Sequence, residues 1–253
     1  IREATISQVE AFHTRYYTPS NAILTIAADL PEGEMFDYAQ KWFGDLDSRP
    51  APIDDIRQEP PQTEARELTL HRDVPVSLIY IAFRIGDRLS REYTVCDVIT
   101  DLLSNGTSSR LYQRLIKEQT LFSSVNAYVT SELDGGMLMI TARLLETTTT
   151  DQAKEALWRE LDELTQSLCQ DHELQKIKNK YEAQNLFSEI NVLNKAINLS
   201  FYEMLGDANL INSDVENHNS VTALEIQQTA RELFTPERSN TILYLSNTTH
   251  PQE

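Results

Sequence analysis

The sequence predicts an α+β fold in which helices pack on one face of a mixed, mostly antiparallel sheet. From residue 67 onward, apolar periodicity follows the order β-α-α-β-β-α-α-α-α-β. Two of these strands are joined through Asp134-Gly135-Gly136, which is typical of a hairpin. In addition, the last helix and strand repeat a pattern found at the beginning of the chain, which indicates a duplicated domain.

The repeat has a period of 217 residues, because Thr5 corresponds to Thr222 and Thr18 to Thr235. In each copy an amphipathic helix is followed by Thr-Pro, an asparagine and an apolar strand. This period is far longer than the roughly 20–50 residues of a solenoid repeat. We therefore expect the chain to begin within the last part of one domain and to contain the whole of the next.

A proline-rich segment separates the two parts. The chain is polar from Asp45 to Arg66, and four of its nine prolines fall within residues 50–61. Proline fixes φ and removes a backbone donor, so this composition favours an extended linker. We predict three parts, which are residues 1–45 as the C-terminal tail of a preceding N-terminal domain, 46–66 as a linker, and 67–248 as a second domain.

In the tail, apolar residues at helical spacing predict a helix over residues 5–17. The apolar run at residues 23–28 predicts a strand. Pro31 at a first turn and Gly44 at an end predict a second helix over residues 31–43. The tail is thus expected to be a helix, a strand and a helix.

In the second domain, the same patterns predict a strand at 76–83, helices at 90–104 and 110–118, strands at 122–130 and 137–144, helices at 153–168, 171–189 and 194–205, and the repeated helix and strand over 222–245. The turn Gly106-Thr107-Ser108-Ser109 precedes the second of these helices. Its hydroxyls predict a capped helix start, while its free N–H groups leave an anion site as the alternative.

Composition excludes several classes of function. The net charge of −17 argues against nucleic acid and against an anionic membrane surface, because both require clustered lysine and arginine. The presence of only seven glycines argues against a glycine-rich phosphate loop, and no apolar run approaches the roughly 20 residues of a membrane span. Cys96 and Cys169 are expected to be buried thiols rather than a disulfide framework.

No catalytic motif is found. The five histidines form neither His-x-x-Glu-His nor His-Glu-x-x-His, and in the nearest fragment, His172-Glu173, Lys176 stands where a second histidine is required. An unrelated enzyme assembled from His71, His172 and Glu173 is a minor alternative. The residues alone therefore indicate a non-catalytic α+β domain attached to the tail of its twin, with no metal ligands.

Three stretches resemble the pitrilysin/insulinase family of zinc peptidases, which includes the mitochondrial processing peptidases. They are VEAFHTRYYTPSNA at residues 9–22, LLSNGTSSRLYQRL at 102–115, and LFSSVNAY at 121–128 with Asp134-Gly135-Gly136 after it. The resemblance implies a metallopeptidase-type duplicated domain. It identifies this chain with the family's catalytically inactive second domain, preceded by the tail of the first.

The resemblance also implies partners. The zinc ligands of this family lie in the N-terminal catalytic domain, so zinc is expected there and none in this chain. The second domain helps to enclose an extended peptide substrate against that domain. The same family contains non-catalytic scaffold proteins and partner subunits of two-subunit peptidases, which is the alternative function. A homodimer, or a heterodimer with a related subunit, is implied for the complete protein.

The chain begins at Ile1 rather than Met, so we expect an excised fragment. The bacterial periplasm and cytoplasm both stay open as compartments.

Family members carry an arginine and a tyrosine in the second domain that contact substrate. The resemblance places Lys117 at the arginine position and Ser123 at the tyrosine position. Lysine keeps the charge without the bidentate fork, and serine lacks the phenol. Lys117, Ser123 and Arg110 are therefore the substrate-binding candidates, although a structural role that holds the turn to a neighbouring element is favoured for Arg110.

Overall fold

The computed structural model describes residues 3–51, 59–130 and 132–247. The chain divides into two compact units, of which the first comprises residues 1–60 and 184–213 and the second residues 61–183 and 214–253. Among the described residues, no helix is both long enough and apolar enough to cross a membrane.

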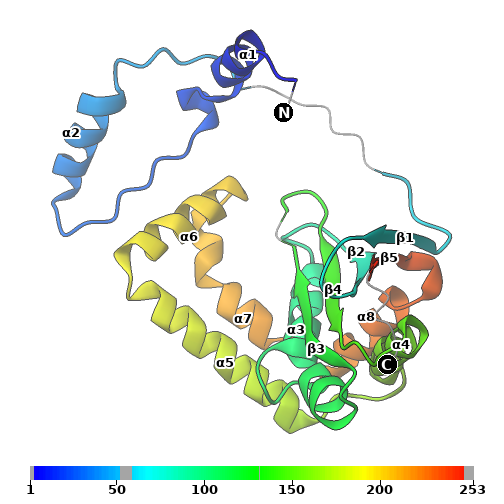
Figure 1. Ribbon diagram of the computed structural model, residues 1–253. Helices are drawn as coiled ribbons and strands as arrows, with labels where there is room; N and C mark the ends of the chain where they lie inside the picture. The colour runs from blue at the N-terminus through cyan, green and yellow to red at the C-terminus, as the bar shows by residue number, and fades with distance from the viewer. Residues whose placement is uncertain (1–2, 52–58, 131, 248–253) are drawn as a thin grey trace. The chain divides into compact units, whose positions relative to one another are not determined.

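The sheet belongs to the second unit and has the strands β1 (Arg66–Arg72), β2 (Leu78–Arg84), β3 (Phe122–Val129), β4 (Met137–Leu144) and β5 (Ser239–Ser246). Their order across the sheet is β1-β5-β2-β4-β3 (Figure 1). β1 and β5 run parallel, whereas the other neighbouring pairs are antiparallel. The predicted mixed, mostly antiparallel sheet is therefore confirmed, with β1 and β3 at its edges.

The helices of the second unit are α3 (Arg91–Ser104), α4 (Thr150–Gln166), α7 (Asp214–Asn219), α8 (Ala223–Leu233) and most of α5 (Asp171–Glu189), together with a π-helix, η2 (Tyr112–Glu118). α4 begins at a capping box, in which Thr149 and Gln152 satisfy each other's backbone N–H groups. Its predicted apolar stripe is buried at Ala153, Leu157 and Leu161. The stripe attaches α4 to the core.

The core lies between one face of the sheet and these helices. On β2, Ile79, Ile81 and Phe83 alternate with less buried neighbours and are fully buried. The Phe83 ring meets Trp158 of α4 and Phe234, just after α8, edge-on at centroid distances of 5.9 and 5.2 Å. The predicted packing of helices on one face is confirmed.

The sequence repeat is visible as repeated local structure. α1 (Ile6–Tyr16) and α8 each begin at a capping box, formed by Thr5 with Gln8 and by Thr222 with Glu225. Each helix is followed by a short 3₁₀ turn, η1 (Pro19–Asn21) or η4 (Pro236–Arg238). The copies then diverge, because β5 pairs with two strands while residues 22–27 pair with none.

The first unit contains α1, α2 (Glu32–Phe43), α6 (Val192–Met204) and the 3₁₀ turn η3 (Ala208–Asn212). α1 and α2 have no buried residue, and Phe12 and Trp42 are 58% and 68% exposed. Ser200 of α6 donates a hydrogen bond to Thr25 Oγ1 at 2.6 Å. The described part of the first unit therefore presents large apolar side chains at its surface.

The predicted strand over residues 23–28 is wrong. A strand requires a neighbour to accept and donate its hydrogen bonds, and the described part of the first unit contains no other strand. β1 was not predicted, because it is a polar, mostly exposed edge strand with only two leucines among its seven residues. α7 was not predicted either, since its six residues are too short for helical periodicity.

The turn before η2 also differs from expectation. Ser109 Oγ does not cap a helix but donates to Gly106 O at 2.7 Å, and Gly106 has a φ of +94° that glycine adopts without strain. The predicted helix over 110–118 becomes a π-helix from Tyr112.

Candidate functional site

The turn formed by residues 105–109 is held against α5 by two lysines one helical turn apart. Lys176 Nζ donates to the backbone and hydroxyl oxygens of Ser108 at 3.2 and 3.0 Å. Lys180 Nζ donates to the side-chain and backbone oxygens of Asn105. Oxygen atoms of this turn are therefore bound by two lysines of the same chain.

Arg110 follows the turn and is 8% exposed. Its Nε and Nη2 donate to the two carboxylate oxygens of Glu173 on α5 at 3.0 and 2.8 Å, which is the bidentate geometry specific to arginine. These hydrogen bonds hold the pKa of Glu173 below its usual range. The guanidinium thus joins the segment before the π-helix to α5, as the structural interpretation of Arg110 predicts.

Arg114 makes a second ionic link, from the π-helix to α4. Its Nη1 donates to Glu160 at 2.9 Å, and Nη1 and Nη2 both donate to Glu163. The hydrogen bonds from Arg114 lower the pKa of Glu163, whereas burial raises the pKa of Glu160. Together with the Arg110 pair, this network fixes both sides of the π-helix.

Lys117 lies near the end of the π-helix and is exposed. Its Nζ is 5.7 Å from the centroid of the Tyr112 ring, a distance at the limit of a cation–π contact. Thr120, three residues further on, has a φ of 52°, which is unusual for a β-branched residue. Both π-helices and such backbone outliers are frequent at functional sites.

Ser123 lies at the start of β3, on the other side of the same connection. Its side chain is exposed, and Oγ donates to Arg143 O at 3.4 Å. A backbone hydrogen bond of 3.0 Å from Leu121 N to Leu115 O ties the π-helix to the strand. Lys117 and Ser123 therefore flank one strained connection, whereas Arg110 is buried among the ion pairs.

The free edge of β3 carries a contact that the sequence did not predict. Ser104, the last residue of α3, accepts a hydrogen bond from Ala127 N at 2.8 Å and donates one to Ala127 O at 2.9 Å. A pocket of about 460 Å³ adjoins it, lined by Asp101, Ser104, Asn105, Asn126, Ala127, Tyr128 and Thr141. While Ser104 holds both groups, an extended peptide cannot pair with Ala127.

Replacing Ser104 with alanine is expected to lower the free energy of unfolding by about 1 kcal/mol, because both backbone groups of Ala127 lose their partner. Urea denaturation followed by circular dichroism measures the change. Ser123→Ala is the matched control, since its hydroxyl is exposed and makes one long hydrogen bond. Equal stability of the two variants would contradict the role assigned to Ser104.

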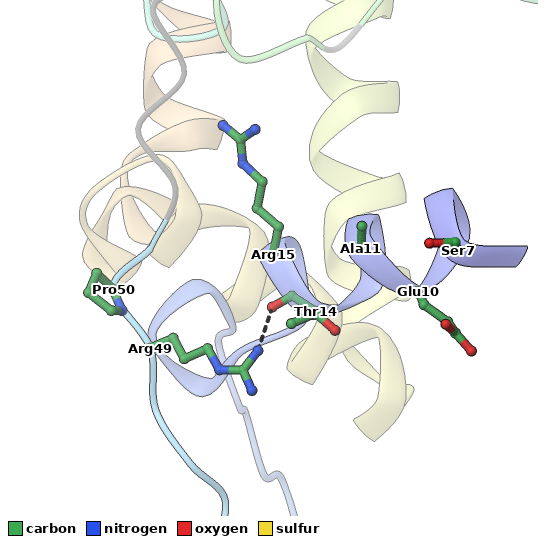
Figure 2. A pocket seen from close by; sticks show the side chains of 7 residues that line it. All are labelled: Ser7, Glu10, Ala11, Thr14, Arg15, Arg49 and Pro50. Atoms are coloured by element: carbon green, nitrogen blue, oxygen red, sulfur yellow. Dashed lines mark hydrogen bonds between the residues drawn. The ribbon is translucent and has the colours of Figure 1, made fainter. Parts of the chain in front are cut away.

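The first unit has a hollow of about 650 Å³ beside α1, lined by Ser7, Glu10, Ala11, Thr14, Arg15, Arg49 and Pro50. Figure 2 shows Arg49 donating to Thr14 O, at 3.3 Å, while Arg15 points away. Arg49 N also donates to Thr18 Oγ1 at 3.0 Å. These contacts join the chain after α2 to the end of α1, and the hollow contains no arrangement of catalytic groups.

The resemblance implies zinc in the N-terminal catalytic domain, and the described residues of this chain do not form a zinc site. Across residues 3–51, 59–130 and 132–247, no three His, Cys, Asp or Glu side chains come together as metal ligands. His71 and His172 are exposed, and Glu173 is engaged by Arg110. His250 lies outside the described residues.

The two cysteines are free and buried, and burial raises the pKa of both thiols. A raised pKa keeps a thiol protonated and unreactive at neutral pH. The expectation of buried thiols is therefore confirmed, and neither sulfur has the properties of a nucleophile.

Comparison with known proteins agrees with this picture. Residues 3–181 match the sequence model of the peptidase M16 inactive domain. The zinc protease PqqE of Helicobacter pylori is 28% identical over 127 residues, covering 49% of this chain and 28% of that protein. The uncharacterized zinc protease YmxG of Bacillus subtilis is 24% identical over 229 residues, covering 88% of this chain and 53% of that protein.

The fold agrees as well. The crystal structure of a protease from Helicobacter pylori superposes with a TM-score of 0.88 at 20% identity, covering 96% of this chain and 60% of that one. The chain spans about half or less of the length of the curated relatives it matches. The family match covers most of the sequence, and the chain belongs to the peptidase M16 inactive domain family.

Proposed function

We propose that this chain is the inactive second domain, with the tail of the first, of a zinc-dependent metalloendopeptidase. In this proposal residues 1–45 complete a catalytic domain, residues 46–66 form the linker, and residues 67–248 help to enclose an extended peptide. Zinc and the catalytic groups belong to that catalytic domain. The relatives named as zinc proteases support the assignment.

One observation carries the proposal: the first copy of the repeat has the same helix and turn as the second copy, but its last segment is not part of a sheet. α1 and η1 reproduce α8 and η4, including the capping box, yet residues 22–27 have no strand beside them. In the second unit the equivalent segment, β5, lies between β1 and β2. The same sequence pattern therefore forms a strand where other strands lie beside it. This supports a sheet in the proposed catalytic domain to which residues 22–27 would add a strand.

The exposed apolar side chains of the first unit support the same partner. Ile23, Leu24 and Ile26 are 43%, 55% and 41% exposed, although they form an apolar run. Contiguous apolar surface on a soluble domain marks an interaction site. A catalytic domain with the fold of the second unit would bury this run in the way that the second unit buries part of β5.

For the peptide, we propose contact at Lys117 and Ser123, where the π-helix meets β3. Both side chains are exposed, and Lys117 supplies a positive charge to carbonyl or carboxylate oxygens. Arg110 is assigned a structural part in this proposal, because Glu173 occupies its guanidinium. Pairing along the whole β3 edge is disfavoured by Ser104.

The test uses the complete protein with its catalytic domain. Lys117→Glu is expected to raise KM for an extended fluorogenic peptide about tenfold with little change in kcat, since the lost contact contributes binding alone. Arg159→Glu is the matched charge reversal, because Arg159 on α4 is exposed and contacts its helix neighbour Glu155. Equal KM values for the two variants would contradict the peptide contact.

The alternative is a scaffold or a partner subunit of a two-subunit peptidase. Ser123 favours it, because a serine at the tyrosine position fits a protein without demand for substrate contact. The zinc content of the purified complete protein separates the two functions. One zinc per chain with peptide hydrolysis supports the proposal, whereas a zinc-free and inactive protein supports the alternative.

A further inference from the structure

The chain leaves and re-enters the second unit at two neighbouring points. α5 passes out of this unit after Ala183, and the chain returns at Asp214, the first residue of α7. Tyr181, two residues before the exit, donates a hydrogen bond from its hydroxyl to Asp214 Oδ2. Tyr181 therefore binds the residue at which the chain re-enters the second unit, and residues 184–213 lie between these two positions in the sequence.

His218 of α7 completes the contact. Its ring stacks on that of Tyr181 with centroids 3.7 Å apart and planes 3° apart, and the residue is 2% exposed. Within the described residues, neither ring nitrogen of His218 has a hydrogen-bond partner. A neutral imidazole tolerates this apolar setting better than an imidazolium, which would require acceptors for two N–H groups.

Charged groups surround the contact unequally. Burial lowers the pKa of His218 to about 4 despite the opposing effects of Asp214 and the Asn219 side chain, and Lys178 of α5 acts in the same direction as burial. Arg88 pairs with Asp214 Oδ1 at 3.5 Å. From α3, Asp97 faces Asp214, and burial raises the pKa of Asp97 to about 7.

We propose that Tyr181, Asp214 and His218 form a latch that joins α5 to α7 at the base of residues 184–213, and that protonation of His218 favours its opening while protonation of Asp97 favours its closure. The charged imidazolium would have two N–H groups to satisfy with the Asn219 oxygen as the unpaired acceptor beside it, so it moves to water and takes α7 away from Tyr181. This device is independent of the zinc site and of peptide contact.

The change of the open population with pH follows from the pKa of His218 in the closed and open states. The opened histidine titrates near pH 6.5 and the closed one near 4, so the open state binds more protons below about pH 6.5. With Asp97 replaced by asparagine, the open population is expected to rise about tenfold or more between pH 7.5 and 5.0. In the native chain Asp97 opposes this change by a comparable or larger factor, because its closed form binds the proton more tightly than its open form.

Hydrogen–deuterium exchange of the chain at pH 7.5 and 5.0, corrected for intrinsic exchange rates, tests the latch. The measurements are made in an Asp97→Asn variant, because this substitution removes the titration of Asp97 that opposes the effect of His218. Protection of residues 176–183 and 214–221 is expected to fall about tenfold at pH 5.0. Adding His218→Phe, which keeps an aromatic stack without a titrating nitrogen, is expected to abolish the fall.

Tyr181→Phe supplies a second variant that keeps the stack and removes the hydrogen bond to Asp214. It is expected to lower protection of residues 214–221 severalfold already at pH 7.5. The latch is overturned if protection in the Asp97→Asn background is the same at both pH values. Equal loss in the His218→Phe variant, or equal loss throughout α4, would overturn it as well.

Discussion

Replacing Arg110 with alanine is expected to lower the free energy of unfolding by about 3 kcal/mol, because it leaves a partly buried carboxylate without its partner. The side chains of Arg110 and Glu173 are 8% and 18% exposed, and two hydrogen bonds join them. Urea denaturation at pH 7.5 measures the loss. Arg110→Lys is expected to recover part of it, since lysine keeps the charge but not the bidentate fork.

The pH dependence provides an internal check. Because Arg110 lowers the pKa of Glu173, the pair stabilises the fold above the unfolded pKa of about 4.3 and loses this effect as acid protonates Glu173. The difference between wild type and Arg110→Ala should therefore shrink below about pH 4. Unchanged stability of Arg110→Ala, with loss of peptide binding in the complete protein, would instead make Arg110 a ligand contact.

Local patterns predicted most of the fold. The stripe of α4 and the alternation along β3 and β4 arise from contacts a few residues apart, so one sequence reveals them. Residues 23–28 have the composition of a strand but become one only if another strand lies beside them. β1 is the converse case, because pairing with β5 makes a strand of a segment for which no strand was predicted.

The site was less predictable for the same reason. Arg110 and Glu173 are 63 positions apart, and Ser104 and Ala127 are 23 apart. No periodicity within a single sequence connects such pairs. The family resemblance proposed Lys117 and Ser123, but no local pattern in the sequence predicted the π-helix that carries Lys117 or the φ of 52° at Thr120.

Replacing Asp97 with asparagine is expected to stabilise the chain by about 2 kcal/mol at pH 8, which is the opposite of the usual effect of a mutation. Burial, with the charges of Asp101 and Asp214, raises the pKa of Asp97 to about 7. At pH 8 the folded chain must therefore hold an unfavourable carboxylate. Asparagine keeps the shape and removes the charge.

The size of this stabilisation is expected to fall with acid, because the pKa of Asp97 is raised in the folded chain. Its folded pKa lies above the unfolded value of about 3.9, so wild type gains stability from this group as pH falls through 7. The advantage of Asp97→Asn should thus shrink by more than half between pH 8 and 5, in urea titrations at both values. Asp101→Asn is a poorer replacement, because Asp101 accepts a hydrogen bond of 2.6 Å from Asn105.

A constant advantage of Asp97→Asn at both pH values would show that the lost charge is not the cause of the stabilisation. A loss of stability at pH 8 would mean that the carboxylate is held by Arg88, which would then be shared between Asp97 and the latch residue Asp214.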